Sequence, residues 1–501
     1  MFERDGCRVS PIIGLEIHVQ LATRTKMFCG CGLEFGATPN SRVGPVCLGM
    51  PGALPVINAR AVEYAVRAGL ALQCEIAGFT KWDRKSYYYP DLPKNYQISQ
   101  YDLPLCGPGH FSFLLDGREI NVRIRRAHLE EDAGKNVHDW PGITAVDLNR
   151  AGTPLLEIVS EPDLHSAEET REFAVQLQRL VSYLGVSEAN MQKGQMRFEP
   201  NINLKIEREG QEFRTPIVEV KNLNSFKALH GAIAFEIERQ FEEWKRIGTT
   251  ASMGNKTNRG WDDVQEVTVA QREKEEAHDY RYFPDPDLVP LTIATQWVND
   301  LRAALPELPI ARTKRFIAEF KLAAKDAPAL VDDRATADLL DAAAGGGADK
   351  ATLGKHFLSY WSRYANERGV TIGALGVPAA TMAELATLVT SGKVNATAAA
   401  QIADAVMERG GANREWPSPA KLAEELGLVQ SRDEGQIGKW VEEAFAANEK
   451  AVKDAIENPK KIQAARGFLL GQVMKISGGK ADPKIVGGLI EDKLKALAGG
   501  G

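Results

Sequence analysis

The stretch IIGLEIHVQL, residues Ile12–Leu21, decides the fold of the first half of this chain. Its odd-numbered positions from 13 to 21 are all apolar, and Glu16, His18 and Gln20 stand between them. A period of two is typical of a β-strand that buries one of its faces. The stretch therefore predicts a strand that carries a carboxylate, an imidazole and an amide on its polar face.

The same alternation recurs in two later stretches, Glu199–Ile206 and Val218–Lys221. Both place acidic, amide or basic residues between apolar ones. A single acidic pair on a strand says little, because the outer face of a sheet commonly carries Lys, Thr and Glu. Repetition on several strands predicts a sheet whose polar side is a reaction surface.

Composition bounds the class of protein. At 501 residues the chain is too long for one ordinary core, so we expect two to four domains. With 44% hydrophobic and 26% charged residues it resembles soluble globular proteins, which disfavours disordered and fibrous classes. No long apolar run and no targeting pattern are visible, so we expect a cytoplasmic protein without a membrane span. The net charge of -6 excludes a generally basic nucleic-acid-binding surface but leaves room for a local one.

Changes in composition and hydrophobic pattern divide the sequence into three regions. Residues 1–292 combine strands with helical stripes, one beginning at Phe173 and another at Phe226, which we expect to cover the apolar back of the sheet. Because the strands are not regularly interrupted by βα units, this is an α+β architecture. From residue 293 the chain is rich in helix formers, which predicts an all-α connector over 293–410 and a helical tail over 411–501.

Eight long segments, in order along nearly the whole chain, carry a resemblance to a known family. They are GLEIHVQLATRTKMFCGC (14–31), VCLGMPGALPVIN (46–58), DRKSYYYPDLPKNYQISQYD (83–102), HLEEDAGK (128–135), DLNRAGTPLLEIVSEPD (147–163), EVKNLNSF (219–226), DYRYFPDPDL (279–288) and GFLLGQVMKISGGKADP (467–483). With these segments the chain resembles the B subunit of the bacterial and organellar glutamyl/aspartyl-tRNA amidotransferases.

The resemblance implies a ligase that amidates Glu-tRNA(Gln), Asp-tRNA(Asn) or both in two steps. ATP with Mg²⁺ first phosphorylates the acyl carboxylate, and ammonia then displaces the phosphate. The resemblance also implies a glutamine-synthetase-like cradle, a partner amidase (A) subunit with glutaminase activity and a small C subunit. The chain shows no P-loop and no Gly-x-Ser-x-Gly nucleophile elbow, in keeping with ammonia from a partner. A stand-alone amine ligase and a non-catalytic tRNA-binding scaffold are the alternatives.

By position in these motifs, five residues resemble the metal-linked members of the family. They are Glu16, His18, Glu131, Glu157 and Glu199. Oxygen ligands suit Mg²⁺, and metal ions neutralise the triphosphate in phosphoryl transfer. At position 199 this chain departs from the family, which usually has Asp in an Arg-Cys-Asp-Ala-Asn segment. The alternative is that Glu157 and Glu199 simply pair with Arg or Lys on neighbouring strands.

Basic residues fill further roles that the resemblance implies. Lys85 and Lys94 bracket the tyrosine run 87–89 and resemble catalytic residues near the exit of an ammonia passage, with Glu131 at its mouth. The alternative is that these tyrosines pack on the sheet with lysines extended beside them. The candidates for phosphate or acyl-acceptor contacts are Lys135, Arg150 and Arg281.

Six cysteines do not form a disulfide framework in a chain of this length. Cys29, Cys31 and Cys47 resemble a zinc knuckle, but Gly44 stands where the family often has a further cysteine. Closed zinc sites usually have four thiolate or imidazole ligands. The sequence therefore favours free thiols and leaves a three-thiol zinc site as the alternative.

The last part of the tail is basic within an acidic chain. Residues 453–495 hold nine Lys or Arg residues against five Asp or Glu residues. Such cations neutralise nucleic-acid phosphates, and the resemblance implies a tail that grips the tRNA body. A solvated helix face is the alternative. The candidates for tRNA contact are Lys460, Lys461, Arg466, Lys475, Lys480 and Lys484.

Overall fold

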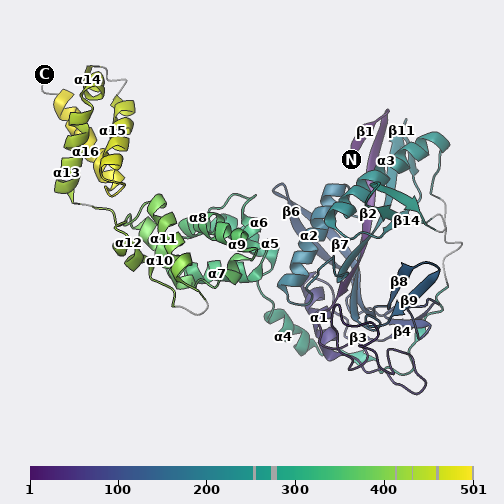
Figure 1. Ribbon diagram of the computed structural model, residues 1–501. Helices are drawn as coiled ribbons and strands as arrows, with labels where there is room; N and C mark the ends of the chain where they lie inside the picture. The colour runs from purple at the N-terminus through teal and green to yellow at the C-terminus, as the bar shows by residue number, and fades with distance from the viewer. Residues whose placement is uncertain (252–255, 272–278, 412–414, 432, 458–461, 499–501) are drawn as a thin grey trace. The chain divides into compact units, whose positions relative to one another are not determined.

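The fold is given by a computed structural model, which describes residues 1–251, 256–271, 279–411, 415–431, 433–457 and 462–498. It divides into two compact units, Met1–Arg312 and Thr313–Gly501. The first unit combines a large sheet with helices, and the second is helical (Figure 1). The expected mixture of strands and helices followed by a helical region is thus confirmed. The domain boundaries after residues 292 and 410 stay predictions.

A ten-stranded sheet forms the centre of the first unit. In spatial order it contains β15 (Val267–Ala270), β14 (Thr257–Asp262), β13 (Val218–Lys221), β11 (Met196–Arg208), β2 (Cys7–Gln20), β10 (Pro154–Ser160), β7 (Arg118–Glu131) and β6 (Gly109–Leu115), while β1 (Phe2–Arg4) pairs with β2 and β12 (Gln211–Arg214) with β11. All neighbours are antiparallel except β13 and β14. The stretch that predicted a strand is β2, and it lies between β11 and β10.

The register aligns the polar residues of neighbouring strands. Glu199 of β11 lies opposite Glu16 of β2. Glu157 of β10 lies opposite His18 on one side and His128 of β7 on the other. Residues directly opposite one another in an antiparallel pair share a face of the sheet. All five side chains therefore stand on the same face.

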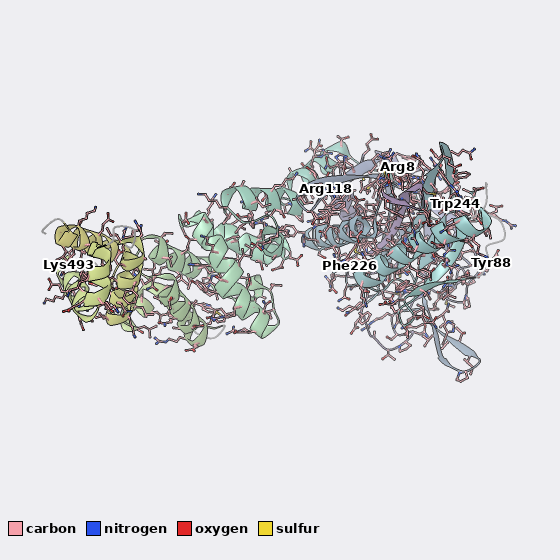
Figure 2. All side chains as sticks on the ribbon, turned by 90° about the horizontal axis from the view of Figure 1, so that it is seen from above. Arg8, Tyr88, Arg118, Phe226, Trp244 and Lys493 are labelled. Carbon is pink, nitrogen blue, oxygen red and sulfur yellow. The ribbon has the colours of Figure 1, made fainter. Side chains whose placement is uncertain are left out.

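Helices cover the apolar face, as the helical stripes predicted. They are α1 (Ala59–Ala71), α2 (Ala167–Tyr183) and α3 (Phe226–Ile247). Leu15 and Ile17 of β2 pack into one core with Phe173 of α2 and Leu229 of α3, all at most 1% exposed. Figure 2 labels Phe226 and Trp244 near the two ends of α3. Ser225 caps α3 by accepting a hydrogen bond from the Ala228 amide.

Small sheets join motifs that are far apart in the sequence. A three-stranded sheet pairs β4 (Asp83–Ser86) with β5 (Tyr96–Ser99) and β16 (Phe283–Pro284). The other two pairs are β3 (Phe79–Thr80) with β17 (Leu291–Thr292), and β8 (Lys135–Trp140) with β9 (Ile143–Asp147). The first of these sheets brings the segment after residue 278 beside the segment that begins at Asp83.

Helices follow from α4 onward. Their bounds are α4 (Thr295–Ala303), α5 (Pro309–Glu319), α6 (Ala327–Val331), α7 (Arg334–Gly345), α8 (Lys350–His356), a π-helix η1 (Phe357–Trp361), α9 (Ser362–Arg368), a 3₁₀-helix η2 (Ile372–Leu375), α10 (Ala379–Thr390), α11 (Ala396–Arg409), α12 (Pro419–Glu425), α13 (Glu434–Ala447), α14 (Glu449–Glu457), α15 (Ile462–Ile476) and α16 (Pro483–Ala498). A core that includes Ile437, Leu469, Val473 and Ile490 joins α13, α15 and α16. Among the described residues, no helix combines the length and apolar character that crossing a membrane requires.

Two substitutions on α3 separate core packing from surface effects. Leu229→Ala removes a fully buried side chain, so we expect the free energy of unfolding of the first unit to fall by about 2–5 kcal/mol. Lys227→Ala changes a side chain that is 88% exposed, and we expect a change within about 0.5 kcal/mol. Hydrogen exchange of the β2 and β11 amides in the full chain measures both. Equal effects of the two substitutions would contradict this packing.

Candidate active site

The polar face of the sheet forms the floor of a cavity of about 610 Å³. Lys85, Tyr87 and Tyr280 line it from the segments beside the small three-stranded sheet. Another hollow, of about 650 Å³, lies among the turns at the far ends of β1, β2, β11 and β12. We take the first as the candidate site because buried acids, bases and imidazoles from separate strands converge in it.

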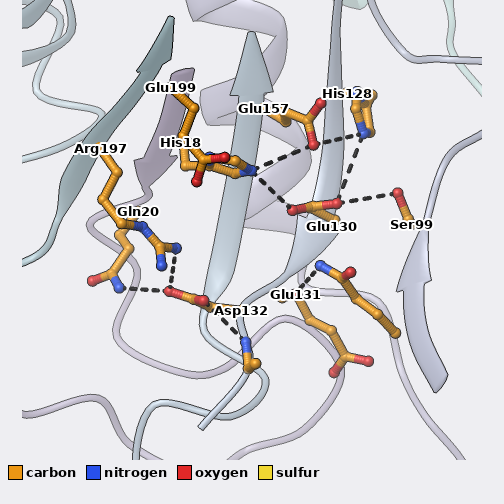
Figure 3. Close-up of polar contacts among 12 residues, drawn as sticks. His18, Gln20, Ser99, His128, Glu130, Glu131, Asp132, Glu157, Arg197 and Glu199 are labelled. Carbon is orange, nitrogen blue, oxygen red and sulfur yellow. Dashed lines mark hydrogen bonds and ion pairs between the residues drawn. The ribbon is translucent and has the colours of Figure 1, made fainter. Parts of the chain in front are cut away.

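Three residues at the floor of this cavity, His18, Glu130 and Glu157, form one group with His128, which is almost fully buried beside them (Figure 3). His18 Nε2 lies 3.5 Å from Glu157 Oε2 and 3.8 Å from Glu130 Oε1. His128 Nε2 lies 3.6 Å from Glu157 Oε2 and 3.8 Å from Glu130 Oε2. Ser99 Oγ donates a hydrogen bond to Glu130 at 3.3 Å. The four side chains form a compact acid–imidazole cluster, called the His–Glu cluster below.

Opposite charges stabilise the ionised forms in this cluster. Burial alone would lower the pKa of His18, but the hydrogen bond and charge of Glu157 and the charge of Glu130 raise it to about 9. Burial alone would raise the pKa of Glu157, but the positive charges of His128 and His18 hold it well below its usual range. Near neutral pH His18 is therefore an imidazolium and Glu157 is a carboxylate.

The donor set fits a divalent cation. Donor atoms of His18, Glu130 and Glu157 lie within 4.8 Å of one another, so one ion can contact all three. Two of the three donors are carboxylate oxygens, the ligands that hard cations such as Mg²⁺ prefer. The Nδ1 atoms of His18 and His128 are buried without a hydrogen-bond partner, so only the Nε2 side of each ring is held by polar contacts, with Glu130 and Glu157.

A second group of charges occupies the neighbouring part of the cavity, on β2, β11 and β13. Lys221 Nζ lies 2.8 Å from Glu199 and 3.0 Å from Glu219, and Lys256 Nζ lies 2.9 Å from Glu219. Burial opposes ionisation of Glu219, but the two lysines lower its pKa to about 2. Glu16, in contrast, has its pKa raised by burial and by nearby carboxylates, and it accepts a hydrogen bond from the Asn201 amide at 3.2 Å.

The structure thus brings four of the five predicted metal-linked residues into one cavity. They are Glu16, His18, Glu157 and Glu199. Glu199 also makes the ion pair with lysine that was the alternative reading of its motif. The structure does not bring the fifth, Glu131, into the His–Glu cluster. Its metal role stays a prediction.

Glu131 lies on the other side of β7, because consecutive residues of a strand point to opposite faces. It pairs with Lys94 and accepts a hydrogen bond from the Ile98 amide at 3.0 Å. Gln97 donates to the Glu131 carbonyl at 2.7 Å. Lys85 lies elsewhere: it lines the cavity, and its Nζ is 4.9 Å from the centre of the Tyr280 ring. The two predicted catalytic lysines therefore stand on different sides of one strand.

Asp132 anchors the neighbouring cations. Its carboxylate accepts hydrogen bonds from Gln20 and Arg197, each at 2.9 Å (Figure 3). Arg150 lies 3.6 Å from the same carboxylate and donates to the carbonyl of Ala133 at 2.9 Å. Arg150 is therefore held by protein groups rather than turned freely to the cavity. The other two candidates for phosphate contact, Lys135 and Arg281, are exposed.

Sequence reasoning missed Glu130 and His128 as site residues. Both stand in the quoted motif HLEEDAGK, and the signal that identifies them is the alternation that singled out Glu16 and His18. On β7, positions 128 and 130 share a face, and the register places that face beside Glu157. Glu130 and Glu131 are adjacent in the motif. Because side chains alternate along the strand, only Glu130 shares a face with His128.

The three cysteines 29, 31 and 47 come together outside the cavity, with their sulfur atoms within 4.8 Å of one another. A Cβ added at Gly44 would lie 2.8 Å from Cys31 Sγ, so the position of the missing fourth ligand adjoins the group. The hydrogen bond from Cys29 and those from the Gly44 amide and the Lys26 ammonium lower the pKa of Cys47 to about 5, although burial opposes this.

The tail candidates for tRNA contact divide into three groups. Lys460 and Lys461 lie outside the described residues. Arg466 pairs with Glu491 at 2.9 Å. The remaining three lysines are exposed and surround the turn between α15 and α16; they are Lys475, Lys480 and Lys484.

Comparison with known proteins matches both halves of the chain to described families. Residues 11–299 match the GatB/GatE catalytic domain, and residues 338–494 match the GatB domain. The chain belongs to the GatB family. The catalytic-domain match contains every residue of the His–Glu cluster, and the second match contains the exposed lysines of the tail.

Three GatB relatives are similar over nearly their whole length. A protein of Geotalea daltonii is 46% identical, covering 97% of this chain and 99% of its own. One of Rhodopirellula baltica is 44% identical, covering 98% and 97%. One of Carboxydothermus hydrogenoformans is 42% identical, covering 97% and 99%. Each of these relatives is named as the B subunit of an aspartyl/glutamyl-tRNA(Asn/Gln) amidotransferase.

The charge pairing in this GatB-family site has a measurable consequence. Glu157→Gln removes the negative charge that favours the imidazolium and replaces a charge-assisted hydrogen bond by a neutral one, so we expect the pKa of His18 to fall from about 9. In the wild type, the ion pair of His18 with Glu157 contributes its full stabilisation of the fold at pH values below the ordinary histidine pKa of about 6.5. This stabilisation is lost as pH rises through about 9. NMR titration of labelled histidine rings in metal-free chain measures the shift.

The matched control for this titration is Glu168→Gln. Glu168 accepts a hydrogen bond from His230 at 3.1 Å on the exposed surface, away from the cavity. We expect this substitution to leave the pKa of His18 unchanged. An unchanged His18 pKa in the Glu157→Gln chain would contradict the proposed pairing.

Proposed function

We propose that this chain activates the acyl group of misacylated tRNA in a glutamine-dependent amidotransferase. In this proposal it phosphorylates the side-chain carboxylate of Glu-tRNA(Gln), Asp-tRNA(Asn) or both with ATP and Mg²⁺, and then transfers ammonia to it. The observation that carries the proposal is the convergence of His18, Glu130 and Glu157 at the floor of one cavity. Membership of the GatB family and the names of its relatives support the substrate.

A carboxylate becomes a good acyl donor only when one of its oxygens carries phosphate. The His–Glu cluster, with Glu16 and Glu199 beside it, supplies the residues that would hold Mg²⁺. Bound Mg²⁺ supplies charge neutralisation for the triphosphate. Lys85 and Arg197 line the same cavity and place positive charge where the carboxylate and the phosphates bind. Burial disfavours a charged Lys85, but the negative charges of Glu130 and Glu157 and the neighbouring tyrosines together outweigh burial and raise its pKa.

The proposal includes a partner amidase (A) subunit that releases ammonia from glutamine, and a small C subunit. The relatives are named as B subunits, which supports an assembly of several chains. We propose that ammonia arrives on the side of β7 where Lys94 pairs with Glu131. Both side chains of this pair are almost fully buried, 8% and 4% exposed, which would shield a neutral nucleophile from bulk water. A glutamine-synthetase-like cradle and a cytoplasmic setting belong to the same proposal.

The helical tail would bind the tRNA body. Lys475, Lys480 and Lys484 are exposed around one turn, which suits contact with several phosphates of a nucleic-acid backbone. Such contacts are independent of base sequence. They would therefore supply affinity, while the acyl group in the cavity supplies the chemistry.

Glu157 provides the test of the phosphorylation step. The full chain, co-purified with its amidase partner, receives ATP, glutamine and misacylated tRNA. We expect Glu157→Gln to reduce acyl-phosphate formation, trapped as the hydroxamate, on the order of 100-fold or more, with tRNA affinity retained. The control is Glu161→Gln, since Glu161 follows the same strand but pairs with Arg125 at 2.9 Å. An unchanged yield of hydroxamate in Glu157→Gln would instead favour the alternative that the chain is a non-catalytic tRNA-binding scaffold.

We also propose that the cysteine group holds Zn²⁺ through Cys29, Cys31 and Cys47. The spacing of the three sulfur atoms favours metal binding, because one ion can contact all three. We expect about one zinc ion per purified chain by elemental analysis, and its loss in Cys31→Ser. The control Cys74→Ser changes a buried thiol outside the group and should retain the metal. Metal-free wild-type chain would overturn this assignment in favour of free thiols.

A further inference from the structure

Five tyrosines form a continuous series of ring contacts beside the cavity. In order along the series they are Tyr89, Tyr87, Tyr280, Tyr282 and Tyr101, with ring centroids 5.9, 6.1, 6.2 and 4.2 Å apart. They come from two segments nearly 180 residues apart in sequence, which the three-stranded sheet of β4, β5 and β16 holds together. The first three contacts are edge-to-face, the usual arrangement of packed rings.

The last contact of the series is different. Tyr101 and Tyr282 are stacked with an angle of 11° between their ring planes. Tyr101 remains 53% exposed. Tyr282 stacks on one face of this ring, and about half of Tyr101 is still accessible to solvent. A flat, supported and accessible aromatic face of this kind is suited to stacking with another planar group.

One cation contacts the backbone of Tyr101, and another is the chain neighbour of Tyr282. Arg126 Nη1 donates a hydrogen bond to the Tyr101 carbonyl at 2.9 Å, which holds the guanidinium at the backbone of Tyr101. Arg281 precedes Tyr282 in the chain, and its side chain is 80% exposed. No ion pair of Arg126 with a carboxylate is seen within the described part of the chain. Arg126 therefore supplies positive charge near Tyr101 that a phosphate can use.

The same face is connected to the candidate active site. Tyr282 contacts Tyr280, and Tyr280 lines the cavity together with Lys85. On β7, Arg126 stands two residues before His128 and therefore on the same face as the His–Glu cluster. A planar group stacked on Tyr101 would thus lie at the rim, two ring contacts from the cavity.

We infer that Tyr101, supported by Tyr282, is the stacking platform for the unpaired terminal base at the 3′ end of the aminoacyl-tRNA. This inference rests on the proposed function and adds the residue that positions the substrate. Unpaired RNA bases are recognised by stacking on aromatic side chains, and Arg126 supplies the neighbouring phosphate contact. The amino acid is esterified to the ribose of that same nucleotide. Holding the base at the rim therefore directs the acyl carboxylate into the cavity.

The test combines a change in the protein with a change in the RNA. The full chain, co-purified with its amidase partner, is titrated with substrate tRNA and with the same tRNA lacking its terminal adenosine. We expect the wild-type complex to bind the intact tRNA on the order of tenfold more tightly. Tyr101→Ala should remove most of this difference, whereas Tyr101→Phe keeps the ring and should retain it. A 2-aminopurine at the terminal position should be quenched by stacking in the wild type and Tyr101→Phe only.

The control variant is Tyr88→Ala, because Tyr88 is 76% exposed and belongs to the same tyrosine-rich segment without a place in the series of ring contacts (Figure 2). It should keep the full discrimination between the two tRNAs. Retained discrimination in Tyr101→Ala would overturn the platform. A rise confined to the KM for ATP would do so as well, since the ring would then stack on the nucleotide cofactor.

The outcomes also separate this inference from the function on which it rests. A wild-type complex that amidates misacylated tRNA but binds intact and truncated tRNA equally would overturn the platform alone. A complex that neither binds nor amidates tRNA would overturn the function and the platform together.

Discussion

Strand parity is the constraint on which the candidate site depends. Four neighbouring strands place their functional side chains on one face only because each alternates with a period of two and all share one antiparallel register. A slip of one residue on β2 would turn Glu16 and His18 into the core and expose Leu15 and Ile17. Burial of that apolar face against α2 and α3 opposes such a slip. The hydrophobic core therefore fixes the site without contacting it.

Gathering so many carboxylates has an electrostatic consequence. Glu157 and Glu219 are held ionised by adjacent cations, whereas the pKa of Glu16 is raised because burial and neighbouring negative charge reinforce each other. A site with surplus negative charge is unfavourable in a partly buried cavity unless cations balance it. Protonated His18 and Lys221 supply part of that balance here. A divalent ion would replace the proton on His18 rather than simply add to the charge.

The sequence allowed prediction of the features that depend on local pattern. Alternation identified β2 and its polar residues, and helical stripes identified α2 and α3. The resemblance then suggested Glu131 as a metal-linked residue. Alternation along β7, however, places Glu130 and not Glu131 on the same face as His128. Other features depend on long-range pairing that no local pattern reports. The tyrosine series joins Tyr101 to Tyr282 only because β4 lies between β5 and β16. The cysteine group likewise depends on how two loops fold together.

Glu130 and Glu131 are adjacent on β7, and their side chains point to opposite faces of the strand. Glu130 belongs to the His–Glu cluster, and Glu131 pairs with Lys94 on the other side of the same strand. Each carboxylate therefore has its own cation, and neither competes for the other's partner. In the proposed reaction, the acyl group would be activated on one side and ammonia would arrive on the other, with a single strand between them. Side chains on opposite faces of one backbone are rigidly related, so the two halves of such a reaction would stay in fixed positions relative to each other.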